Sequence, residues 1–157
     1  MAKRFSDALA TKVEDFQRPP NLPAGHYTFQ VTKHADISEF ESRDGVTFDR
    51  VTFTCTPVAA QDDVDEDELS QFGDYSKVAV RKQFLIPDGE QDAAGYDNSM
   101  FNVRRFLEHC GIKEDVPLGE ALADAVMTQF MGELNHRPDK NNPEIVYQEI
   151  GRTALAE

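Results

Sequence analysis

Aromatic and basic side chains recur at alternate positions in two stretches of the sequence. Phe48 and Arg50 lie two residues apart, and the pair Arg81-Lys82 is followed closely by Phe84. In an extended strand, residues two apart point to the same face. Aromatic rings can stack on exposed bases, and arginine or lysine side chains can hold phosphates. The two stretches are therefore candidates for contacts with a single-stranded nucleic acid.

Further basic and aromatic residues flank these stretches and extend the predicted interface. The complete set of predicted contact residues is Lys33, Phe40, Arg43, Phe48, Arg50, Tyr75, Lys77, Arg81, Lys82 and Phe84. A structural role competes with this interpretation for each residue. The rings of Phe48 and Phe84 can belong to the core, and Arg50 and Lys82 can be solvated charges on a sheet. The adjacent Arg104-Arg105 is predicted to lie on the solvent side of a helix.

Residues 62–68 form an acidic cluster in which only Val64 is not acidic. Asp63, Asp65 and Asp67 match the first three ligand positions of a calcium loop, but Glu68 stands where the sharp turn requires glycine. We therefore favour a solvated acidic loop, or a segment that repels nucleic acid from one side of the protein, over a calcium site.

No motif for catalysis or for a cofactor is found in the sequence. It lacks a glycine-rich phosphate loop, a GxSxG nucleophile motif and an HExxH zinc motif. The four histidines lack the close helical spacing of a zinc site, and there is no CxxC pair. The sequence therefore predicts a protein that is not an enzyme and that needs neither a metal nor another cofactor.

The composition is that of a folded chain with one domain. Its 157 residues are 39% hydrophobic and 29% charged, and the formal net charge is -13. Such a charge argues against broad, unspecific phosphate binding, although it permits a local basic groove. The sequence contains no apolar run of membrane-spanning length and no signal-peptide pattern, so we expect a cytoplasmic protein. In that reducing compartment, Cys55 and Cys110 are expected to be buried thiols.

Apolar periodicity places the elements that carry these residues. The predicted strands cover residues 26–32, 47–58, 77–86, 130–135 and 145–150. A helix is predicted from Met100 to Cys110, capped by Asn98 or Ser99, and a short helix begins near Pro117. The acidic excursion is predicted to end in a helical turn before Gly73. The first two strands are predicted to pair as a long antiparallel hairpin.

An amphipathic helix is also predicted at the N-terminus, over residues 4–16. Phe5, Leu9, Val13 and Phe16 share one side at helical spacing, and the prolines that follow would end the helix. We therefore divide the chain into a helical lead-in, residues 1–20, and a single domain, residues 21–157.

Three strands, a helical interlude and two strands form a mainly β (α+β) pattern. Five strands with a helix between the third and the fourth is the order of an OB-fold barrel, whose second and third strands bind oligonucleotides. The sequence thus predicts a five-stranded OB-like barrel with an N-terminal helix. A five-stranded mixed α+β sandwich has the same order of elements and remains an alternative.

The layout resembles that of small phage proteins of the OB-fold single-stranded-DNA-binding type. The stretches that carry the resemblance are LPAGHYTFQV, VTFTCTPV, FNVRRFLEHCGI and GELNHRPDKNNPEIVYQEIGR, within residues 22–152. The resemblance implies binding of single-stranded DNA during phage replication or recombination in the host cytoplasm. Phage replication or recombination proteins are then further candidate partners.

Two other functions compete with single-strand binding. The chain can be a structural or assembly protein of a virion, or an acidic inhibitor that mimics DNA. The sequence predicts no membrane partner. It leaves open the oligomeric state, the site size and the preference between DNA and RNA.

Overall fold

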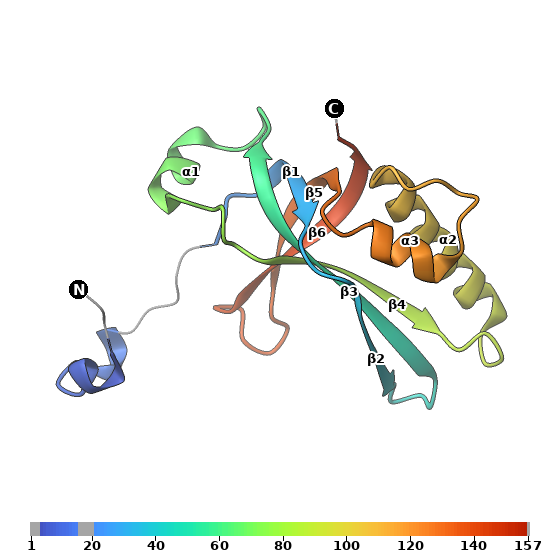
Figure 1. Ribbon diagram of the computed structural model, residues 1–157. Coiled ribbons are helices and arrows are strands. Elements are labelled where there is room, and N and C mark those ends of the chain that lie inside the picture. The colour runs from blue at the N-terminus through green and yellow to red at the C-terminus, as the bar shows by residue number, and fades with distance from the viewer. Residues whose placement is uncertain (1–3, 16–20, 157) are drawn as a thin grey trace.

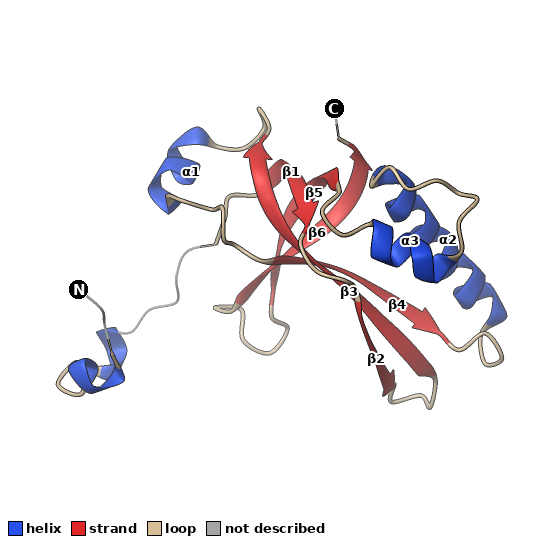
Figure 2. Cartoon of the chain, viewed as in Figure 1, coloured by secondary structure: helices blue, strands red, loops and turns tan. Residues whose placement is uncertain are grey.

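The computed structural model describes residues 4–15 and 21–156, and in this part of the chain six strands form one mixed sheet (Figure 1, Figure 2). The strands are β1 (Gly25–Val31), β2 (Asp36–Glu41), β3 (Thr47–Ala60), β4 (Val80–Pro87), β5 (Gln129–Pro138) and β6 (Val146–Leu155). The α-helices are α1 (Glu66–Phe72), α2 (Ala93–His109) and α3 (Leu118–Asp124), and two short 3-10 helices, η1 (Phe5–Ala8) and η2 (Val13–Asp15), precede them. The prediction of a mainly β protein is confirmed.

The sheet closes into a ring of five strands. Its order is β1-β5-β6-β4-β3-β2, and β1 pairs with β3 as well as with β5. Only β4 and β6 run parallel, and a single bridge, Arg81 to Glu149, joins them. The helices α2 and α3 lie between β4 and β5 in the chain, as the order of predicted elements required. The ring therefore has one weakly joined seam, between β4 and β6.

Strand β2 was not predicted from the sequence. It lies in the connection between the first two predicted strands and pairs antiparallel with the first half of β3. Five of its six residues are exposed, so it lacks the buried alternation by which the other strands were found. The predicted hairpin is thus partly right: β1 does pair antiparallel with β3, but only with its second half, from Cys55 to Ala60.

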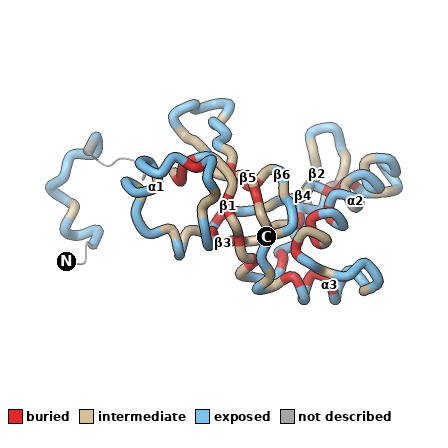
Figure 3. Tube along the Cα trace, turned by 90° about the horizontal axis from the view of Figure 1, so that it is seen from above, coloured by how far each residue is buried: buried red, intermediate tan, exposed pale blue. Residues whose placement is uncertain are grey.

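The core lies inside the ring and is rich in aromatic rings. Phe29 of β1 stacks on Phe130 of β5, with ring centroids 5.7 Å apart. Phe106 of α2 contacts Phe130 at 4.9 Å and Phe53 of β3 at 4.8 Å. Burying each such ring contributes roughly 1.5–3 kcal/mol. The buried residues follow the strands of the ring and one side of α2 (Figure 3). Helix α2 therefore packs one side against the ring and leaves the side chains of its other side exposed.

Both cysteines are buried free thiols, as predicted. Burial raises the pKa of Cys55 to about 12 and that of Cys110 to about 11. Because the thiolate is the reactive form, both groups are unreactive at neutral pH.

Helix α2 begins earlier than predicted. Its N-cap is Asp92, whose carboxylate accepts a hydrogen bond from the backbone N–H of Gly95 at 2.9 Å, so the predicted caps Asn98 and Ser99 lie inside the helix. The first turns carry no buried side chain, which is why apolar periodicity missed them. Gly111, with φ +83°, follows the helix at its C-terminal end, as predicted.

The predicted N-terminal helix over residues 4–16 is wrong for the part that the structure describes. Two 3-10 turns, η1 and η2, replace it, and Phe16 lies outside the described residues. The side chains of Phe5, Leu9 and Val13 are exposed. A short helix is marginal in water unless its apolar face packs on something, and here that face is not buried.

In the described residues, no helix has both the length and the apolar character needed to cross a membrane.

Candidate nucleic-acid interface

The side of β2, β3 and β4 that points away from the core forms a continuous surface, which we call the outer face. Its residues are Asp36, Ser38 and Phe40 of β2, Phe48, Arg50, Thr52 and Thr54 of β3, and Arg81, Gln83 and Leu85 of β4. Cross-strand partners in an antiparallel pair point to the same side. The register therefore places Phe40 beside Phe48, and Leu85 beside Arg50.

Two aromatic rings and a guanidinium form the centre of this outer face. The rings of Phe40 and Phe48 are stacked, with centroids 5.4 Å apart and planes 13° apart. The guanidinium carbon of Arg50 lies 4.8 Å from the centroid of Phe40. Both rings are partly exposed and Arg50 is exposed. This arrangement offers an aromatic surface on which a base can stack, next to a cation that can contact its phosphate.

Four further predicted contact residues are exposed cations outside this centre. Arg81 is exposed on the outer face beside Thr54. Lys33 is exposed between β1 and β2, Arg43 is exposed in the turn between β2 and β3, and Lys77 is exposed before β4. Arg43 lies in the turn that joins the strands of Phe40 and Phe48, whereas Arg81 lies beside Thr54, six residues further along β3. Lys33 and Lys77 lie close in sequence to Val31 and Val80, which both pair with Cys55 of β3.

Tyr75 packs on the core and lies near the start of β1. Its ring is half-buried and meets the ring of Tyr27 edge-on, with centroids 6.4 Å apart. The hydroxyl of Tyr27 donates a hydrogen bond to the carbonyl oxygen of Pro23 at 2.6 Å. Burial, followed by the neighbouring Tyr75, raises the pKa of Tyr27 to about 12. The structure thus groups Tyr75 with these core residues and not with the outer face.

Lys82 and Phe84 do not lie on the outer face. The ammonium group of Lys82 donates to the carbonyl oxygens of Gly151 at 2.8 Å and Ile150 at 3.4 Å. The ring of Phe84 packs against Phe106, with centroids 5.6 Å apart. Burial lowers the pKa of Lys82. The side chains of these two residues therefore lie on the side of β4 opposite to that of Arg81.

The sequence contained the signal for this division. Neighbours in a strand point to opposite faces, so Arg81 and Lys82 cannot share one surface. By the same rule, Gln83 and Leu85 belong with Arg81 on the outer face, and neither was among the predicted contact residues. Leu85 is 46% exposed and lies beside Arg50, where it can contact the apolar part of a base.

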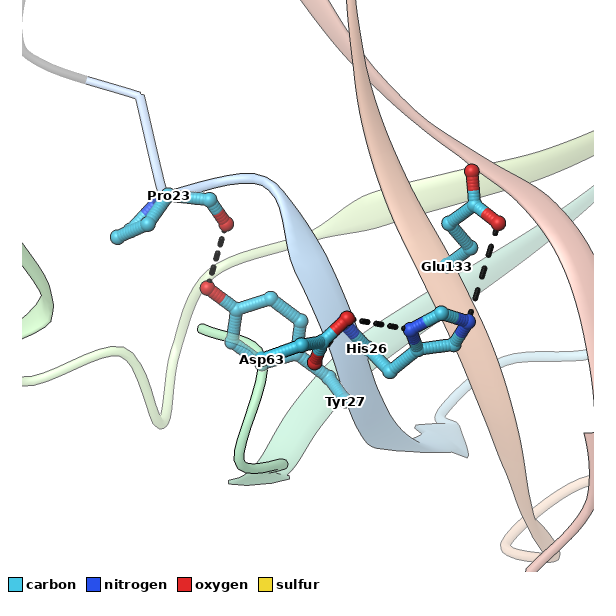
Figure 4. A network of polar contacts seen from close by, with 5 residues as sticks. All are labelled: Pro23, His26, Tyr27, Asp63 and Glu133. Atoms are coloured by element: carbon cyan, nitrogen blue, oxygen red, sulfur yellow. Dashed lines mark hydrogen bonds and ion pairs between the residues drawn. The ribbon is translucent and has the colours of Figure 1, made fainter. Parts of the chain in front are cut away.

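The acidic segment 62–68 is attached to the start of β1 (Figure 4). The carboxylate of Asp63 accepts hydrogen bonds from the backbone N–H of His26 at 3.0 Å and from its ring nitrogen Nδ1 at 2.6 Å. The other ring nitrogen of His26 lies 3.8 Å from the carboxylate of Glu133. The hydrogen bonds from His26 lower the pKa of Asp63. The histidine thus bridges the acidic segment and β5.

A glycine allows the acidic segment to pack this closely. Gly25 has φ +141°, and a Cβ atom on it would lie 2.7 Å from a methyl carbon of Val64, which is buried. Asp65 then caps α1 by accepting from the backbone N–H of Glu68. Residues 66–72 are helical, so the twelve-residue calcium loop considered above does not form, and the described residues contain no cluster of side chains suited to a metal ion.

The acidic segment and the stacked rings lie at opposite ends of β3. Phe48 is near the start of this 14-residue strand, and the acidic segment follows its last residue, Ala60. A strand rises about 3.3 Å per residue, so the two ends lie roughly 40 Å apart. This separation is several times the Debye length of about 8 Å at physiological ionic strength. The acidic segment therefore does not border the outer face at Phe48.

No protein-family model matches this sequence, and no curated protein matches it either.

Proposed function

We propose that this chain binds single-stranded DNA without catalysing a reaction, and that its ring of five strands is an OB-like barrel. The strand order supports the proposal, because an OB fold is a five-stranded, partly open Greek-key barrel. In this interpretation β1, β3, β4, β5 and β6 are the five barrel strands. Strand β2 is then an insertion in the connection between the first and second barrel strands.

The single observation that carries the proposal is the partly exposed stacked pair Phe40–Phe48 on the outer face, with Arg50 over the ring of Phe40. In OB folds, oligonucleotides bind to the face of the second and third strands, which correspond here to β3 and β4. A ring stacks on any base, since every base has a π-face, and such a contact is worth about 1–3 kcal/mol. We therefore expect binding with little sequence preference.

The biological setting that we propose is phage replication or recombination in the cytoplasm of an infected host. It rests on the resemblance of the strand and helix patterns to small phage single-strand-binding proteins. Replication or recombination proteins of the phage are proposed as further partners.

A fluorescence-anisotropy titration tests the proposal. Labelled oligo-dT of about 15 nucleotides, within the range of OB site sizes, is compared with duplex of equal length over a series of salt concentrations. We expect preference for the single strand and a loss of affinity as salt rises. Equal affinity for the duplex would contradict the proposal. A virion structural protein would bind neither oligonucleotide at any salt concentration, and a DNA mimic would bind a basic protein instead.

A further inference from the structure

A cleft with a volume of about 660 Å³ opens where β4 and β6 separate, and α2 lies across it. The two strands meet only at the bridge between Arg81 and Glu149. Beyond it, the ammonium group of Lys82 spans the gap by donating to the carbonyl oxygens of Ile150 and Gly151. An ammonium group has three N–H donors, so one remains for a further acceptor.

Cations line this cleft, although the protein as a whole is strongly acidic. Lys82 of β4, Arg105 of α2 and Arg152 of β6 line it, and His109 of α2 is a further lining residue. No carboxylate is found among the lining residues in the part of the chain that the structure describes. For a chain with a net charge of -13, this is an unusual concentration of positive charge.

The two arginines of the cleft are not neutralised. Within residues 4–15 and 21–156, neither Arg105 nor Arg152 forms an ion pair with a carboxylate. The neighbouring Arg104 differs, because its guanidinium contacts Glu108 at 3.0 Å and Glu114 at 2.5 Å. An unpaired arginine can bind a phosphate with two parallel hydrogen bonds, whereas Arg104 is already occupied by carboxylates.

Neutral polar groups complete the lining. The ring nitrogen Nδ1 of His109 and the hydroxyl of Thr153 are hydrogen-bonded at 2.7 Å. Burial and the neighbouring Arg105 lower the pKa of His109, while Glu108 opposes them. The side chain of Asn102 adds a further polar group. The cleft therefore offers hydrogen-bond partners and net positive charge together, which suits a phosphate group.

The cleft is continuous with the outer face. Gln83 and Leu85 lie on the outer face beside Thr52 and Arg50, and both also line the cleft. A single-stranded nucleic acid stacked on the rings of the outer face can thus continue over the edge of β4 to the cleft.

We propose that the cleft between β4, α2 and β6 is a phosphate-binding site that holds the sugar–phosphate backbone of the single strand beyond the outer face. This inference rests on the proposed function. The same phosphate chemistry could come from a free nucleotide, which the experiment distinguishes.

The test combines affinity and a local probe on the folded full chain. The test variant carries both Arg105→Gln and Arg152→Gln, since glutamine is a neutral, polar residue that suits these surface positions in α2 and β6. Arg104→Gln is the matched control. With labelled oligo-dT, we expect the double variant to lower the salt slope by about 1.4, because each lost phosphate contact removes about 0.7 for single strands. We expect the control to leave the slope unchanged. In NMR spectra of the native chain, oligo-dT is expected to shift the imidazole signals of His109, and the double variant is expected to lose the shift assigned to that ring.

Two other outcomes would overturn the proposal. If oligo-dT binds with an unchanged slope in the double variant and a silent His109, the cleft proposal is overturned while single-strand binding stands. If pyrophosphate or thymidine monophosphate shifts His109 but oligo-dT does not bind, both the strand path and the proposed function are overturned, and the cleft is a site for free phosphate compounds.

Discussion

The outer face near the start of β3 and the acidic segment after its end differ in what their charged groups contact. At the outer face, Arg50 lies over an aromatic ring and forms no ion pair among the described residues. At the other end, Asp63 is bound to His26, which also faces Glu133. A net charge of -13 therefore does not describe each surface, because the acidic segment and the unpaired Arg50 lie at opposite ends of one strand.

The largest effect is expected where the acidic segment packs on β1. Gly25→Ala should destabilise the protein by about 2–6 kcal/mol, from backbone strain of about 1–3 kcal/mol and a clash with Val64 worth a similar amount. Thermal and denaturant unfolding measure this. Gly119→Ala is the control, since nothing lies within 4 Å of the Cβ that it would add and the site is in helix α3. Equal stability of the two variants would mean that the acidic segment is not packed against Gly25.

The next effect concerns the stacked rings of the outer face. Phe40→Ala and Phe48→Ala should each weaken oligo-dT binding by about 1–3 kcal/mol, the value of one stacked base. Folding should lose only about 0.2–1 kcal/mol, as for other cross-strand pairs. Anisotropy titrations and melting curves separate the two effects. The control is Phe101→Ala, which removes a 53% exposed ring from α2. If this control weakens binding as much as the other two variants, the stacking site is not on the outer face.

A smaller effect is expected for the cation over these rings. Arg50→Gln should lower the salt slope of oligo-dT binding by roughly 0.7, because one phosphate contact is lost. Arg137→Gln removes a cation that is paired with Glu149 at 3.2 Å and should leave the slope unchanged. Titrations at several salt concentrations measure both slopes. The same slope for Arg50→Gln and the native protein would show that Arg50 makes no phosphate contact.

We expect the contact between Asp63 and His26 to make the free energy of unfolding depend weakly on pH. The pKa of Asp63 is lowered in the folded state by the hydrogen bonds from His26. Its contribution to stability is therefore present above the unfolded pKa of about 3.9 and is lost as the pH falls through the lower folded value. Asp63→Asn should flatten this part of the stability profile, measured by denaturant unfolding between neutral and acidic pH. Asp62→Asn, at the adjacent position, should not, and a flattening of equal size in both variants would argue against the His26 contact.

The smallest effect is expected from neutralising the acids themselves. If the acidic segment bordered the strand-binding surface, replacing its carboxylates by Asn and Gln would tighten binding, most of all at low salt. Because the segment lies at the opposite end of β3 from the stacked rings, we expect less than about a twofold change at physiological salt, where screening is strong. Clear tightening at that salt concentration would place the bound strand near α1.

Local patterns in the sequence were sufficient to predict many elements of this protein. Strict alternation identified the buried faces of β1 and β3, because side chains in a strand point in turn to opposite sides. Periodic apolar residues identified the packed part of α2, and turn chemistry identified the ends. Apolar patterns did not predict β2, and they predicted an N-terminal helix that does not form in the described residues. In both segments few or no side chains are buried, so the apolar pattern does not reflect packing there.

The sequence by itself therefore determined the mainly β class, most strand positions and the two free buried thiols. Only the tertiary structure decided which strands meet, and with that which residues share a surface. Strand pairing brings Phe40 beside Phe48, and the length of β3 separates the acidic segment from them. It also brings Arg152 to Arg105 across a seam held by one bridge. Such long-range contacts depend on how the ring closes, and no local pattern of residues encodes that closure.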